Sequence, residues 1–100
     1  MSEAACLRLR IHGVVQGVGF RWSLHREAVR LELAGWVRNR RDGSVEAVVA
    51  GEADKIDALI AACRNGPPAS QVENIEQKDA GHGELDSRNA GERFSVLPTT

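Results

Sequence analysis

Hydrophobic and polar residues alternate near the start of the chain. Leu7, Leu9 and Ile11 lie on one side of an extended chain, and polar residues separate them. An alternation with a period of two is typical of a strand that buries one face and exposes the other. We therefore predict a half-buried strand from Cys6 to His12.

The hydrophobic spacing then changes to three or four residues, which predicts a helix from Phe20 to Leu33. The residues on its apolar face are Phe20, Leu24, Ala28 and Leu31. The residues expected to widen that face or to pack beside it are Trp22, Val29 and Leu33. A helix with such a face needs an apolar surface to cover.

A hairpin is predicted next, with strands from Trp36 to Arg40 and from Val45 to Ala50 around an Asp-Gly turn. A second helix follows Glu52, and its apolar residues are Ile56, Leu59, Ile60 and Cys63. Gly66 and two prolines end this helix, because glycine caps a helix readily and proline cannot continue one.

The last third of the chain is less regular. Residues 72–78 predict a weakly patterned strand, and the polar, glycine-rich residues 79–92 predict a loop. Residues 93–97 predict a short closing strand. The order is thus β-α-β-β-α-β with a short extra strand.

This order predicts an α+β fold, the ferredoxin-like sandwich, in which two helices cover one face of an antiparallel sheet. A sheet covered on one face explains why the first strand alternates instead of being apolar throughout. No repeat or linker divides the chain. We expect a single domain over residues 1–100, with a core from about residue 7 to residue 97.

Composition excludes several classes of protein. The net charge of −1 argues against strong nonspecific binding to nucleic acid. No apolar run approaches the roughly 20 residues that span a bilayer, and the first residues do not form a signal peptide. We therefore expect a cytoplasmic protein without membrane partners. Cys6 and Cys63 have no ligand spacing, so we interpret both as small buried hydrophobes and expect no metal site.

Residues 12–21 (HGVVQGVGFR) join the first strand to the first helix. Their glycine spacing fits neither the dinucleotide fingerprint nor the P-loop. A glycine-rich turn before a helix nevertheless offers backbone N–H groups to an anion, and Arg21 follows in the first helical turn. The residues alone leave a second interpretation open, an ordinary turn followed by an exposed arginine.

Three motifs make the chain similar to the acylphosphatase family. They are GVVQGVGFR at residues 13–21, GWVRN at residues 35–39 and GPPAS at residues 66–70. The resemblance extends from about Leu7 to Val96, in the family's element order. Motifs of this length, in this order, are far more specific than a lone glycine pattern.

The resemblance implies an acylphosphatase, a small monomeric hydrolase that converts an acyl phosphate into a carboxylate and inorganic phosphate without a metal or cofactor. It implies that Arg21 binds the phosphate and that Asn39 orients the attacking water. The loop residues implied to cradle the phosphate through their backbone are Val15, Gln16, Gly17, Val18, Gly19 and Phe20.

The chemical groups near the loop agree with the hydrolysis of acyl phosphates that the resemblance implies. No nucleophile lies in the loop, and Ser23 has no evident base, so we interpret it as an ordinary helix residue. The leaving group of an acyl phosphate is a carboxylate with a pKa of roughly 4, which needs no general acid. A site that offers only positioning and positive charge therefore selects mixed anhydrides over ordinary phosphate esters.

Two positions depart from the family pattern. Glu32 stands where glycine is common, and a left-handed backbone there would cost on the order of 1–2 kcal/mol. Arg40 replaces a small hydroxyl residue found in some members. The cluster of arginines from Arg38 to Arg41 either attracts anionic substrates or is a solvated hairpin tip.

Two other functions are compatible with the predicted fold. A catalytically silent phosphate-binding module would share the scaffold, since a related domain occurs within larger maturation proteins. The length of 100 residues leaves no room for such partner domains. An RNA-binding module is disfavoured by the net charge and by the lack of stacking aromatics, because Trp36 is interpreted as a packing residue.

Overall fold

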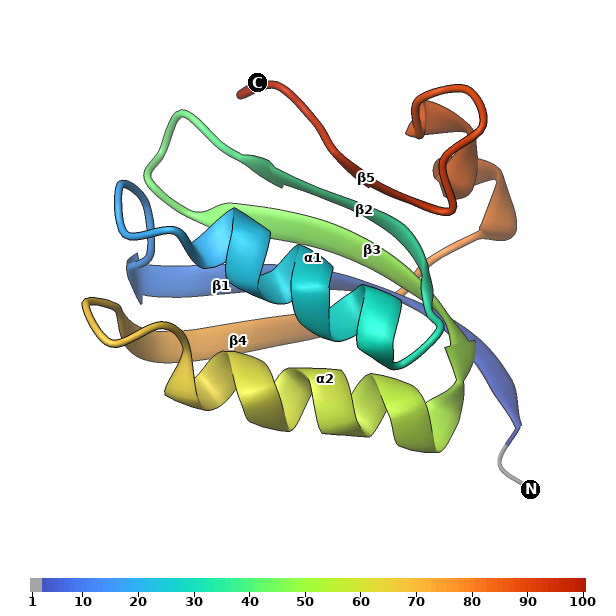
Figure 1. Ribbon diagram of the computed structural model, residues 1–100, viewed down its shortest axis with the longest axis horizontal. Coiled ribbons are helices and arrows are strands. Elements are labelled where there is room, and N and C mark those ends of the chain that lie inside the picture. Colours follow the sequence, from blue (N-terminus) through green and yellow to red (C-terminus); the bar gives the residue numbers. More distant parts are fainter. Residues whose placement is uncertain (1–2) are drawn as a thin grey trace.

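Two layers form the protein, a five-stranded sheet and a pair of helices that cover one of its faces (Figure 1). The computed structural model describes residues 3–100. The elements in chain order are β1 (Ala4–Val14), α1 (Phe20–Arg30), β2 (Ala34–Asn39), β3 (Val45–Glu52), α2 (Ala53–Asn65), β4 (Gln71–Asp79), the 3-10 helix η1 (His82–Ser87) and β5 (Phe94–Val96). The predicted ferredoxin-like α+β architecture is confirmed.

The strands lie in the order β4-β1-β3-β2-β5. The first four are antiparallel to their neighbours, whereas β5 runs parallel to β2. The sheet is therefore mixed: the predicted antiparallel pairing holds for the first four strands, and the short extra strand β5 pairs in parallel. The reason is the crossing of residues 80–93, which carry the chain from the β4 edge to the opposite edge and start β5 beside the start of β2.

The main core lies between the sheet and the two helices. Alternate residues of the central strands, such as Leu9, Ile11 and Val49, meet Leu24 of α1 and Leu59 of α2 there, and all are buried. Burial of apolar side chains contributes about 25 cal/mol per Å² removed from water. This contact holds the two helices, and with them the start of α1, in place against the sheet.

A smaller core lies on the other face of the sheet. Trp36 and Cys6 pack there with Val48, and Leu85 of η1 packs against them. The Trp36 indole donates a hydrogen bond to the Glu84 carbonyl oxygen at 2.8 Å. Trp36 is thus a packing residue, as predicted. Residues 79–92 were expected to be a loop, but they include the 3-10 helix η1. Its Leu85 packs against the smaller core and so covers part of this face of the sheet.

Helix α1 is shorter than predicted and ends at Arg30. Glu32 has a φ of 59°, which turns the chain from the helix toward β2. Trp22 and Val29 were expected on or beside the apolar face, and this was wrong, because they are 62% and 56% exposed. With 3.6 residues per turn, each residue of a helix is rotated by about 100° from the one before it. Trp22 is two residues from both Phe20 and Leu24, so its side chain points to the side of α1 opposite theirs.

Both cysteines are buried, as predicted, and both are free thiols. Cys6 belongs to the small core, and Cys63 belongs to the main core on the opposite side of the sheet. Burial, with a contribution from the charge of Glu27, raises the pKa of the Cys63 thiol to about 12. The thiol therefore stays protonated and behaves as an apolar group. None of the helices formed by residues 3–100 is long and apolar enough to cross a membrane.

Candidate functional site

The loop between β1 and α1 presents its backbone to solvent. Gly17 and Gly19 have φ angles of 74° and 79°, which L side chains rarely adopt. Gly19 is the N-cap of α1, and the first turn of this helix has neither a side-chain cap nor an acidic residue. The N–H groups of this turn therefore have no intrahelical acceptor, and the helix dipole adds positive potential beside them. Such a helix start suits an anion.

The glycines of this segment have two different roles. A Cβ atom on Gly17 or Gly19 would meet nothing within 4 Å, so the space above the loop is open. A Cβ atom on Gly13 would lie 2.0 Å from the Gln71 carbonyl oxygen. The register between β1 and β4 also shifts at Gly13. Gly13 thus lets β4 approach β1, and only Gly17 and Gly19 shape the loop.

An open pocket of about 140 Å³ lies above the loop. Of the residues predicted from the sequence to form the site, it brings together Val15, Gly17, Gly19, Phe20, Arg21 and Asn39, and it adds Trp22. Val15 and Phe20 are buried and Val18 is partly buried against the core, so their side chains anchor the loop from below. Val18 and Gln16 do not line the pocket.

The Gln16 side chain points away from the pocket, toward the β2–β3 hairpin. Its Nε2 donates hydrogen bonds to the carbonyl oxygens of Arg40 and Ser44, at 2.7 and 2.9 Å. This pair of bonds fixes the loop to the hairpin that carries Asn39. The sequence predicted only a backbone role for Gln16, so this link was not predicted. The sequence feature that could have indicated this link is Gln16 itself, because it is the one amide side chain in a loop of glycine and valine.

Arg21 is half-buried at the pocket and has almost no partner. Its Nη1 is 3.5 Å from the Leu97 carbonyl oxygen, the limit of a hydrogen bond. None of the ion pairs formed within residues 3–100 includes Arg21. A guanidinium has five donors in a planar fork. Most of the hydrogen-bonding capacity of Arg21 is therefore free for a ligand.

Asn39 ends β2 at the pocket. Its backbone pairs with Val45, and its carbonyl oxygen accepts a hydrogen bond from the Thr100 N–H at 3.2 Å. Its side-chain Oδ1 is buried and has no hydrogen-bond partner among the described residues. An unpaired buried acceptor costs about 1–3 kcal/mol. The amide oxygen thus lacks a donor beside the same pocket that Arg21 lines.

The site has few other chemical groups. Within residues 3–100, no three His, Cys, Asp or Glu side chains lie together as a metal site would need. His12 pairs with Glu76 at 3.1 Å, and His25 packs its ring between Trp22 and Phe94. What the pocket offers is therefore backbone N–H groups, one guanidinium and one amide.

The hairpin arginines divide into two groups. Arg38 and Arg40 turn to the outer face of the sheet, where they contact the Glu46 carboxylate at 2.8 and 3.4 Å. Arg41 is exposed at the hairpin tip. Arg38 and Arg40 thus share one buried carboxylate, and the interpretation of Arg38–Arg41 as one solvated tip holds only for Arg41.

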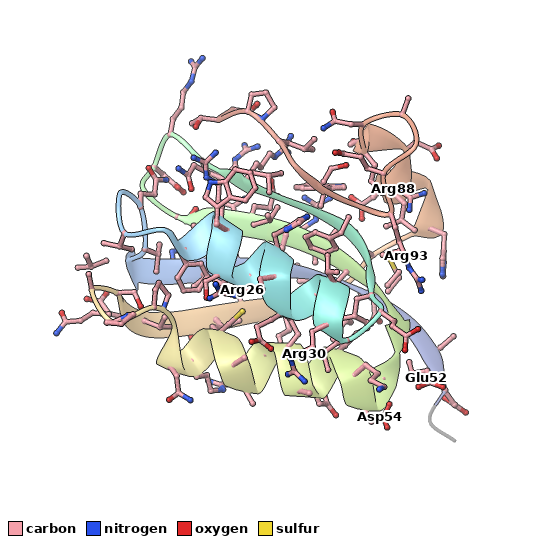
Figure 2. All side chains as sticks on the ribbon, in the orientation of Figure 1. Arg26, Arg30, Glu52, Asp54, Arg88 and Arg93 are labelled. Atoms are coloured by element: carbon pink, nitrogen blue, oxygen red, sulfur yellow. The ribbon has the colours of Figure 1, made fainter. Side chains whose placement is uncertain are left out.

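A second open groove, of about 290 Å³, lies beside Glu32, Glu52, Lys55 and Arg93. Figure 2 shows Arg88 and Arg93 on the side of the molecule away from the loop between β1 and α1. The groove carries two carboxylates beside its two cations, so it attracts phosphate less than the pocket at Arg21 does.

Comparisons with known proteins give one consistent family. The sequence profile of the acylphosphatase family matches residues 7–94. An acylphosphatase from Bradyrhizobium diazoefficiens is 52% identical over 95 residues, which cover 95% of this chain and 96% of that protein. An acylphosphatase from Nitrobacter hamburgensis is 55% identical over 89 residues, which cover 89% of this chain and 90% of that protein.

Solved structures agree. The acylphosphatase from Bacillus subtilis is 35% identical with a TM-score of 0.79, over 95% of this chain and 99% of that one. Full-length HypF, in a phosphate- and nucleotide-bound form, is 26% identical with a TM-score of 0.80. That match covers 99% of this chain but only 12% of HypF. The same scaffold therefore occurs both alone and within a much longer chain.

Proposed function

This chain belongs to the acylphosphatase family, and we propose that it hydrolyses acyl phosphates at the pocket beside Arg21 and Asn39. The products are a carboxylate and inorganic phosphate. The observation that carries the assignment of the site is the convergence of three features on one pocket: a helix start without a side-chain cap, a guanidinium with a single long hydrogen bond and an unpaired amide oxygen.

The phosphoryl group binds at the loop. The backbone N–H groups of residues 15–20 donate to its oxygens, and the start of α1 adds the positive end of the helix dipole. The open space at Gly17 and Gly19 supports this placement, because no side chain keeps the phosphate from the backbone. Arg21 donates to two phosphate oxygens with its planar fork.

Asn39 orients the attacking water. An amide can accept from the water through Oδ1 and donate to a phosphate oxygen through Nδ2. The unpaired Oδ1 supports this role, since it has no donor among the described residues. The proton of the water passes to the substrate's own phosphate, because the pocket holds no carboxylate or imidazole in its lining.

The rate enhancement then comes from position and charge. In phosphoryl transfer, charge spreads over the phosphoryl oxygens, and donors preset around them stabilise it. The departing carboxylate needs no acid, because its conjugate acid has a pKa of roughly 4. Serine and tyrosine phosphates lack such a leaving group, so this site hydrolyses them far more slowly.

The alternative function is a catalytically silent phosphate-binding module, which the match to one part of HypF brings forward. Sequence identity favours the enzyme. The chain is 52% and 55% identical to proteins described as acylphosphatases and 26% identical to HypF.

The protein works as a monomer in the cytoplasm and binds no nucleic acid. Among residues 3–100 the exposed large hydrophobic side chains are Val14, Trp22 and Val29, whereas a stable dimer usually buries about 1,200–2,000 Å² of surface. The net charge of −1 opposes binding to a polyanion.

The experiment that tests the function is phosphate release from benzoyl phosphate in excess EDTA. We expect turnover far above spontaneous hydrolysis, at the same rate with and without the chelator. A folded protein that releases no phosphate above background would refute the enzyme and leave the silent module. A rate that falls in EDTA would refute the metal-free mechanism.

A further inference from the structure

Trp22 is the largest exposed apolar side chain beside the pocket. It follows Arg21 on α1, is 62% exposed and lines the same pocket as Arg21 and Asn39. A single exposed apolar residue is ordinary on a protein surface. This one differs because it forms part of the wall above the loop.

The other lining residues cannot supply an apolar contact to a ligand. Val15 and Phe20 are 1% and 2% exposed, so their side chains are already used in the core. Gly17 and Gly19 have no side chain, and Arg21 and Asn39 are polar. Trp22 is therefore the sole exposed apolar side chain among the residues described as lining this pocket.

The indole ring of Trp22 is also held in position. It meets the His25 ring edge to face, with a centroid distance of 5.9 Å and an interplanar angle of 76°. His25 in turn meets the buried Phe94 at 5.9 Å. This chain of rings connects the exposed indole to the core, so a ligand that packs on Trp22 meets a surface that is already ordered.

We propose that Trp22 is the residue that recognises the acyl group and that it gives the enzyme a preference for aromatic or bulky apolar acyl phosphates over small ones. This proposal rests on the proposed function. With the phosphoryl group on the loop, the acyl group is the part of the substrate that extends toward the pocket wall. An aromatic acyl group can stack on the indole or meet its edge, whereas an acetyl group has little surface to bury.

The test compares benzoyl phosphate with acetyl phosphate in the wild type and in Trp22→Ala. We expect the ratio of the two kcat/KM values to fall about tenfold in Trp22→Ala, a size typical of one lost apolar contact. Trp22→Phe should restore most of the ratio, because it keeps an aromatic face. Val29→Ala is the matched control, since Val29 is 56% exposed on the same helix and does not line the pocket.

A second measurement keeps this proposal separate from the proposed function. Benzoylmethylphosphonate and acetonylphosphonate replace the bridging oxygen of the two substrates by carbon and cannot be hydrolysed. We expect the ratio of their dissociation constants to change about tenfold in Trp22→Ala and to stay unchanged in Val29→Ala. This result can hold even if the wild type hydrolyses neither substrate, in which case the proposed function fails and the recognition by Trp22 stands.

Equal effects of Trp22→Ala on both members of each pair would overturn the proposal, since they would mean that the indole supports the fold or the phosphate site instead of the acyl group. Circular dichroism of each variant establishes that the fold is retained.

Discussion

Glu32 connects α1 to β2 in a left-handed backbone conformation, with a φ of 59°. It is the sole residue other than glycine with a positive φ in the described part of the chain. The Arg93 guanidinium donates to the Glu32 carbonyl oxygen at 2.6 Å, which helps to hold the turn. The left-handed backbone expected from the sequence at this position is thus present, and it lies at the opposite end of α1 from the loop between β1 and α1.

Replacing Glu32 by glycine should stabilise the protein. The left-handed conformation costs an L residue about 1–2 kcal/mol, and glycine loses part of that gain to its larger backbone entropy in the unfolded chain. We expect Glu32→Gly to raise the free energy of unfolding by about 1 kcal/mol in urea titrations.

The matched control is Arg26→Gly, on the exposed side of α1 (Figure 2). The same change to glycine within a helix should lower the free energy of unfolding by about 1 kcal/mol. Two variants with the same sign would contradict the explanation by backbone conformation.

At the scale of elements, one carboxylate joins three strands on the outer face of the sheet. Glu46 of β3 is 2% exposed and contacts Arg8 of β1, Arg38 of β2 and Arg40 just after β2. Burial alone would raise the pKa of Glu46. The hydrogen bonds and charges of Arg38 and Arg8 outweigh burial and hold this pKa below its ordinary value.

This arrangement predicts a loss of stability in acid. A carboxyl whose pKa is lower in the folded protein stabilises it above the unfolded pKa, about 4.3, and loses that contribution as the pH falls through the folded pKa. At pH 7, Glu46→Gln should lower the free energy of unfolding by about 1.5–3 kcal/mol, the range for hydrogen bonds to charged groups. The difference between wild type and variant should shrink steadily below about pH 4.3.

Glu76→Gln provides the control. Glu76 lies on β4, is exposed and pairs with His12 of the adjacent strand β1. Its loss should change the free energy of unfolding by less than about 0.5 kcal/mol at pH 7. A difference between wild type and Glu46→Gln that does not depend on pH would contradict the role given to the ionised carboxylate.

At the scale of the whole molecule, the site is assembled at one end of the sheet from distant segments. The loop between β1 and α1 and the hairpin between β2 and β3 lie at the same end (Figure 1). Gln16 joins them through its bonds to the hairpin carbonyls. This link fixes the loop between β1 and α1 to the hairpin that follows Asn39.

The sequence predicted most of the fold because the strands and helices of the first two thirds of the chain carry a clear hydrophobic period. The alternation at Leu7, Leu9 and Ile11 and the helical spacing from Phe20 to Leu31 each specify one buried face, and the structure buries most of those residues. Arg21 and Asn39 were found through motifs, and the structure brings them to one pocket. Their roles stay predictions.

What could not be predicted depends on contacts between distant segments. The exposure of Trp22 follows from the helical angle, but its place on the pocket wall depends on how α1 sits on the sheet. The link made by Gln16 needs two carbonyl oxygens from another hairpin. The parallel pairing of β5 depends on a crossing that has no hydrophobic period.

The central claim is that Arg21 holds the phosphate while Asn39 directs the water. Its most direct test measures turnover of benzoyl phosphate and the dissociation constant of inorganic phosphate in Asn39→Ala, with Arg21→Ala as the comparison. We expect Asn39→Ala to lose about 10²–10³ in kcat while its phosphate affinity stays near that of the wild type, and Arg21→Ala to lose both. Equal loss of turnover and phosphate affinity in Asn39→Ala, or turnover that survives the substitution, would contradict the account.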